Sequence, residues 1–176
     1  EFRRVLFRSG SSSFKELVLP NSVKRLGKDA LSDNHELKRV VLPKGLTEIP
    51  EGLCCMCREL EDAEIPANVR TVKREAFRYC EKLKVAFPYG LERIEALAFE
   101  HCLADSIVLP STVKYLEGAP FRHVKGLKKI YSLAETPPVC TIDPQRFTDS
   151  INPFDGSAPK DIPIYVPIGS AEKYRK

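Results

Sequence analysis

The sequence predicts a repeat solenoid with a parallel β-sheet of short strands on one face and turns and irregular or helical returns on the other. A proline-centred phrase recurs five times, at Pro20, Pro43, Pro66, Pro88 and Pro110, which gives spacings of 23, 23, 22 and 22 residues. Apolar residues occupy fixed positions around each of these prolines. A period in the low twenties is typical of stacked repeats, because no single copy can bury its own apolar face.

The segment before each proline is expected to form a strand. In residues 37–43 (LKRVVLP), Val40 and Leu42 alternate with Arg39 and Val41, which is the period-two pattern of a half-buried strand. Proline cannot donate a hydrogen bond to a neighbouring strand, so each strand should end there and the chain should turn. Because the copies share a register, we expect the five strands to form one parallel sheet.

The segment after each proline carries apolar residues three, six and eleven positions later. The first two positions suit a second short strand, and a helical or irregular return should follow. The third position is held by Leu31, Cys54, Phe77, Phe99 and Phe121. Small residues precede Phe77 and Phe99, so we expect both rings to lie in the core.

Residues 60–82 (LEDAEIPANVRTVKREAFRYCEK) resemble the BspA-like class of leucine-rich repeats at almost every position of its pattern. The second copy departs from the pattern with Leu53-Cys54 in place of Ala-Phe, and the fourth is one residue short before Pro88. The resemblance implies a leucine-rich-repeat solenoid from a bacterial surface or secreted protein. It also implies adhesion, with protein binding or glycan attachment through the sheet face.

Three parts of the chain are expected. Residues 1–9 lack the repeat and are interpreted as an adaptor or cloning remnant, so the native N-terminus would be missing and a signal peptide could not be observed. Residues 10–126 should form the solenoid of about five repeats, and residues 127–176 a terminal repeat and a C-terminal cap that is cut short. Five prolines between positions 137 and 159 argue against regular repeat continuation, while Ile164 could belong to a closing strand and Ser170 could cap a final helix.

Bulk composition excludes two classes of partner. The formal charge of +4 is modest and no face is rich in Lys and Arg, so nucleic acid is not an expected partner. No apolar run approaches the length of a membrane-spanning helix, so this segment is not expected to insert into a membrane. We expect a monomer.

The cysteines and histidines suggest metal sites, but packing is the favoured interpretation. Cys57, Cys80 and Cys102 each follow a repeat proline by fourteen positions, and the equivalent residues elsewhere are Asn34 and Val124. A position that accepts Val does not require a metal, so we expect buried free thiols. The C-x-x-C of residues 54–57 is a weak zinc signal without a second pair.

His101 and His123 should lie side by side. A solvated turn is the favoured interpretation of this pair, and a two-histidine metal site is the alternative. No metal, cofactor or catalytic residues are therefore assigned, and the chain is not expected to be an enzyme.

The outward positions of the strands give the candidate binding face. They lie two and four residues before each proline and continue into the terminal repeat: Glu16, Val18, Arg39, Val41, Asp62, Glu64, Lys84, Ala86, Ser106, Val108, Lys129 and Tyr131. The charged column alternates in sign, which ordinary cross-strand support would also explain. The expected function is a non-enzymatic binding module for a protein or glycan. The alternatives are an architectural spacer or cap that supports another domain, and an accessory domain of a larger enzyme.

Overall fold

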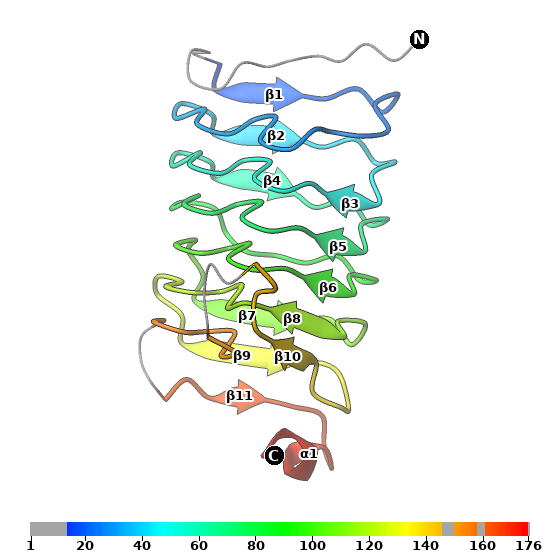
Figure 1. Ribbon diagram of the computed structural model, residues 1–176, viewed down its shortest axis with the longest axis vertical. Helices are drawn as coiled ribbons and strands as arrows, with labels where there is room; N and C mark the ends of the chain where they lie inside the picture. Colours follow the sequence, from blue (N-terminus) through cyan, green and yellow to red (C-terminus); the bar gives the residue numbers. More distant parts are fainter. Residues whose placement is uncertain (1–13, 146–149, 158–160, 176) are drawn as a thin grey trace.

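The computed structural model describes residues 14–145, 150–157 and 161–175, which form a column of stacked turns (Figure 1). The first strand of each turn lies on one side of the column, and the second strand lies beside it after a bend at the proline. All strand pairs are parallel. The predicted solenoid of short parallel strands is therefore confirmed.

The first strands form two three-stranded sheets. One contains β1 (Glu16–Val18), β2 (Arg39–Val41) and β4 (Asp62–Glu64), and the other contains β7 (Ser106–Leu109), β9 (Lys129–Ser132) and β11 (Ile164–Tyr165). The expectation of one continuous sheet is wrong, because the segment before Pro88 forms no strand. Lys84 makes only an isolated bridge to Leu103.

The position of the missing residue in the fourth repeat explains this break, because the copy before Pro110 is equally short but keeps two residues between the buried Ala104 and Ile107 and forms β7. Two residues separate the buried Leu37 from the buried Val40, but Lys84 alone separates Leu83 from Val85. Because strand side chains alternate between faces, the segment cannot keep Leu83 and Phe87 inward and still match the register of β4. The sheet therefore stops at β4 and resumes at β7.

The second strands form one continuous sheet of five. The predicted second strand is present in the second to fifth repeats and absent from the first, and the terminal unit adds the fifth strand. The order of the sheet is β10 (Val139–Thr141), β8 (Tyr115–Glu117), β6 (Arg93–Ile94), β5 (Thr71–Val72) and β3 (Glu48–Ile49). The returns that follow are irregular rather than helical. Each contains residues with positive φ, such as Glu75, Tyr79, Leu97 and His101, which turn the chain too tightly for a helix.

The core is a row of stacked side chains along the axis. Phe77, Phe99 and Phe121 are buried, and their neighbouring ring centroids lie 5.4 and 5.9 Å apart. Phe87 packs edge-on against Phe99 and Phe121. Offset stacking and edge contacts are the favoured arrangements of buried aromatic rings. The predicted burial of Phe77 and Phe99 is confirmed.

A sixth turn continues the column beyond residue 126. After β9 and β10, Phe154 stacks on Phe121 at 5.2 Å, and the Ser157 hydroxyl donates a hydrogen bond to the Phe121 carbonyl. Pro137, Pro138, Pro144 and Pro153 lie outside its strands and do not prevent the turn. Within the insertion between β10 and Phe154, the Asp143 carboxylate lies 2.6 Å from Arg74 Nη2, and both side chains are buried.

The chain then adds β11 and the short helix α1 (Ala171–Tyr174). Ser170 precedes α1 as expected, although its side chain makes no capping hydrogen bond. Tyr174 holds the helix in place, because its hydroxyl donates to the Ala134 carbonyl and also bonds Ser132 Oγ. Within the described ranges, no helix has the length and apolarity that crossing a bilayer requires. The predicted remnant at residues 1–9 lies outside the described residues.

Candidate functional site

Arg39 lies at the centre of the N-terminal sheet face. The register of β1, β2 and β4 places Glu16, Arg39 and Asp62 in one row. The Arg39 guanidinium lies 2.5 Å from Glu16 Oε1 and 3.0 Å from Asp62 Oδ2, with all three side chains about half exposed. Two hydrogen bonds raise the pKa of Arg39, and the bond to Asp62 contributes more than the bond to Glu16. The charge alternation in the sequence is therefore an ion-pair row.

A shallow hollow of about 340 Å³ lies beside this row. Four of the predicted binding residues line it, namely Arg39, Val41, Asp62 and Glu64. The loops that follow β2 and β4 add Lys44 and Asn68. The hollow thus combines cationic, anionic and amide groups above a short apolar strip.

The predicted binding columns are interrupted at the fourth repeat. Lys84 and Ala86 are exposed but belong to no strand. Beyond them, β7 and β9 bring Ser106 beside Lys129 and Val108 beside Tyr131. The structure therefore divides the twelve predicted residues between two faces and leaves Lys84 and Ala86 at the break between them.

The C-terminal face carries aromatic rings in addition to Lys129. Tyr131 stacks on Tyr165 of β11, with ring centroids 4.9 Å apart. Tyr165 was not among the predicted binding residues, because the terminal unit does not follow the proline spacing. The signal that could have found it is the similarity of IPIYVP (residues 162–167) to the strand phrase of the repeats.

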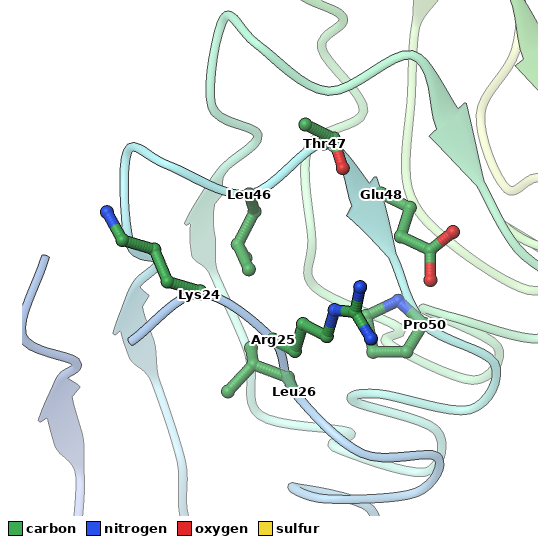
Figure 2. Close-up of a pocket in the computed structure, with 7 residues that line it drawn as sticks. All are labelled: Lys24, Arg25, Leu26, Leu46, Thr47, Glu48 and Pro50. Atoms are coloured by element: carbon green, nitrogen blue, oxygen red, sulfur yellow. The ribbon is translucent and has the colours of Figure 1, made fainter. Parts of the chain in front are cut away.

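A second hollow, which the sequence did not indicate, lies at the edge strand β3. It measures about 330 Å³, and Figure 2 shows its seven lining residues, which are Lys24, Arg25, Leu26, Leu46, Thr47, Glu48 and Pro50. The first repeat forms no second strand to cover β3. The hollow is therefore a consequence of where the five-stranded sheet ends.

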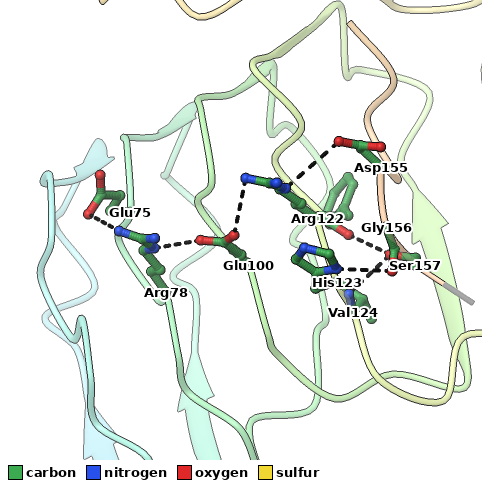
Figure 3. Close-up of polar contacts among 10 residues, drawn as sticks. Glu75, Arg78, Glu100, Arg122, His123, Val124, Asp155, Gly156 and Ser157 are labelled. Atoms are coloured by element: carbon green, nitrogen blue, oxygen red, sulfur yellow. Dashed lines mark hydrogen bonds and ion pairs between the residues drawn. The ribbon is translucent and has the colours of Figure 1, made fainter. Parts of the chain in front are cut away.

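A chain of ion pairs crosses the returns of four consecutive turns (Figure 3). Arg78 lies between Glu75 and Glu100, and Arg122 lies between Glu100 and Asp155. Glu100 is almost fully buried, and Arg78 Nε donates to its Oε2 at 2.5 Å. Carboxylates and guanidinium groups alternate along this row, so the charges compensate one another.

The two histidines lie next to this row and are stacked as expected. His101 packs between Tyr79 and His123, with ring centroids 4.6 and 5.0 Å apart. Burial is the main cause that lowers the pKa of His101, because a desolvated site disfavours the imidazolium form. This shift favours the neutral imidazole form of His101.

The predicted cysteine row is also present. Cys57, Cys80 and Cys102 are buried and free, and each thiol donates to the carbonyl of Leu31, Cys54 or Phe77 in the preceding turn, at 3.1–3.2 Å. Asn34 at the same position instead donates to the Leu31 carbonyl of its own turn. Burial raises the pKa of Cys80 and Cys102, so these thiols are poor nucleophiles.

Comparison with known families gives a match over most of the chain. The family described as "BspA type Leucine rich repeat region (6 copies)" matches residues 2–128 and 47–152. No curated protein gives a significant match.

Two solved structures have the same fold. The Treponema pallidum leucine-rich repeat protein has a TM-score of 0.64 and 22% identity, over 93% of this chain and 83% of its own. A leucine-rich repeat protein from Bacteroides ovatus has a TM-score of 0.60 and 20% identity, over 74% of this chain. The matched region is 43% of the Bacteroides protein's length. At these identities the likeness concerns the fold alone.

Proposed function

This chain belongs to the BspA-type leucine-rich repeat family, and we propose that it is a non-enzymatic binding module that holds a protein ligand on the face formed by β1, β2 and β4. The observation that carries the proposal is the hollow of about 340 Å³ over β2 and β4. Solenoids present extended surfaces of this kind, whose outward residues are free to vary without disturbing the core.

The chemistry of the hollow favours a protein over a glycan. Arg39, Asp62 and Glu64 offer charges of both signs, and Lys44 and Asn68 add hydrogen-bonding groups at the rim. Complementary charges steer association between proteins and fix the orientation of the partner. The hollow has no aromatic ring on which a sugar could stack, whereas Tyr131 and Tyr165 lie on the other sheet.

Surface display is part of the proposal. The family is generally associated with bacterial surface proteins, where attachment to a partner would be the function of an exposed sheet face. The alternatives are a spacer or cap that supports another domain, and an accessory domain of a larger enzyme. Both alternatives use the stacked core and leave the hollow without a role.

The test is binding to a panel of immobilised extracellular-matrix proteins and to a glycan array. Arg39→Glu reverses one charge of the hollow, and we expect it to abolish binding. Lys73→Glu is the matched control, because Lys73 also forms an exposed ion pair, with Glu48 at 2.9 Å, but directly after β5 of the five-stranded sheet.

The outcomes separate the candidates. A protein ligand that is lost with Arg39→Glu and kept with Lys73→Glu supports the proposed site. If only glycans bind, and their binding is lost with Arg39→Glu and kept with Lys73→Glu, the ligand is a glycan and not a protein. A ligand that binds both variants equally would place the binding site elsewhere on the chain and overturn the proposed face. No ligand at all would favour the spacer or accessory interpretation.

A further inference from the structure

We propose that Glu100, His101 and His123 form a binding site for a divalent transition-metal ion of the zinc type. Within the described part of the chain, they are the one group of three histidine, cysteine or acidic side chains with mutually close ligand atoms, all within 4.8 Å of one another. The site does not depend on the proposed function, because it lies on the returns and away from the hollow.

The donor set suits zinc. Zn²⁺ takes imidazole nitrogens and carboxylate oxygens, and three protein ligands leave a fourth position for water. Zinc–ligand bonds of about 2.0–2.1 Å in a tetrahedral site place the ligand atoms about 3.3 Å from one another. Because His123 is fixed by a hydrogen bond to Gly156, rotation of the Glu100 and His101 side chains has to close the remaining distance. Both rings are only partly buried, so the ion can reach them from solvent.

His123 is held in the orientation that a ligand needs. Its Nδ1 lies 3.0 Å from the Gly156 carbonyl, so Nδ1 carries the proton and donates, and Nε2 keeps its lone pair. Metal-binding histidines commonly donate their second ring nitrogen to a carbonyl in this way. His101 lies on the neighbouring turn and stacks on His123. Because an imidazole binds a metal in the plane of its ring, the His101 ring has to tilt out of this stack to share an ion with His123.

Gly156 is itself adapted to this arrangement. It has a φ of 65°, and a Cβ at this position would lie 2.2 Å from His123 Cε1. Only glycine leaves room for the ring in its present place, so the returning sixth turn provides both the acceptor and the space.

Charge compensation permits a cation at this place. Arg78 bonds Glu100 Oε2, whereas Arg122 approaches Oε1 only to 3.8 Å, so Oε1 keeps its capacity to bind a metal. Glu75 and Asp155 neutralise the outer sides of the two arginines. Nearby, Lys125 bonds Glu81 at 2.5 Å. The guanidinium groups nevertheless reduce the affinity relative to a site with several carboxylates.

The test is titration of the metal-free full chain with ZnCl₂ alone, followed by calorimetry and by the ¹H NMR signals of the three histidines. We expect one equivalent of zinc to bind, with shifts of the His101 and His123 signals and none of His35. His101→Gln should weaken binding at least about tenfold, and Gly156→Ala, which displaces the His123 ring, about 10- to 100-fold.

His35→Gln is the matched control and should bind as the parent does. The double variant Cys55→Ser/Cys140→Ser removes the thiols that are not fully buried and should also leave binding intact. Loss of binding in the cysteine variant would place the ion on the thiols and overturn the proposal. Absence of binding, or unchanged His101 and His123 signals on saturation, would overturn it as well, and the NMR readout needs no variant to fold.

Discussion

The two sets of strands respond differently to the same short repeat. The first strands stop at β4 and resume at β7, whereas the second strands run without interruption from β3 through β5, β6 and β8 to β10. The missing residue lies between Leu83 and Pro88, upstream of the turn. After Pro88, Leu91 and Ile94 keep the spacing of every other copy and are buried.

This difference teaches that register in the solenoid is set locally at each proline. A deletion within the strand segment itself, here between Leu83 and Pro88, shifts that strand, because side chains alternate between faces with a period of two. The turn at the proline then restores the position of the next strand. The core behind the second sheet is therefore continuous, while the sheet face in front of it is divided.

The continuous part of the core should show the largest effect of mutation. Phe99 lies in the fourth repeat, fully buried between Phe77 and Phe121. Phe99→Ala should lower the free energy of unfolding by about 3–5 kcal/mol, because the cavity cannot collapse between two stacked rings. Phe77→Ala should behave similarly, and chemical denaturation measures both.

Tyr89→Ala is the control from the same repeat. Tyr89 is 75% exposed, so its removal should change stability by no more than about 0.5 kcal/mol. A loss of unfolding free energy below about 1 kcal/mol for Phe99→Ala would mean that the stacked rings contribute little to the stability of the core.

The buried ion pair of Arg74 and Asp143 should come next. It joins the return after β5 to the insertion after β10, sixty-nine positions apart in the sequence. Asp143→Ala leaves the buried guanidinium without this partner, and we expect a loss of about 3 kcal/mol. Thermal unfolding at fixed pH measures it, and Asp161→Ala, at an exposed position, serves as the control.

If the pair held only the insertion, the loss would be confined to that segment. Hydrogen exchange would then show faster exchange at residues 139–145 and unchanged protection in β5. We expect faster exchange in both places, because the pair connects them.

A single inserted residue should repair the divided face. A threonine inserted between Lys84 and Val85 restores the two-residue interval that separates Leu37 from Val40. The segment before Pro88 can then pair with β4, and we expect a gain of at most about 1 kcal/mol from the new cross-strand contacts. Slower amide exchange at residues 84–87 is the direct measurement, and unchanged exchange there would show that something other than register divides the sheet.

Sequence reasoning reached the fold because each structural position repeats. The prolines, the position of Phe77, Phe99 and Phe121, and the position of Cys57, Cys80 and Cys102 each occur several times, so one copy supports the next. The sequence shows that the fourth copy is one residue short, but it does not predict that the sheet is divided. The effect of the missing residue depends on which segment of the repeat is shortened.

The candidate sites were less predictable. The Arg39 row follows directly from the strand register, but the hollow beside it also depends on the loops that carry Lys44 and Asn68. His101 and His123 were expected to be neighbours, whereas the roles of Glu100 and Gly156 depend on side-chain orientation and on a sixth turn without the proline spacing. Contacts that occur once in a solenoid leave no repeated pattern in the sequence.

The smallest effect on stability is expected for Arg39, on the divided face. Arg39→Met keeps the aliphatic stem and removes both ion pairs, which are exposed to solvent and therefore contribute little to folding. Arg93→Met is the matched variant on the continuous sheet, where Arg93 pairs with the partly buried Glu117 and lies 4.4 Å from the centre of the Tyr115 ring. We expect the denaturation midpoint to move clearly for Arg93→Met and to stay nearly unchanged for Arg39→Met. A large loss for Arg39→Met would mean that the row supports the sheet, and its charges could then no longer be assigned to ligand binding alone.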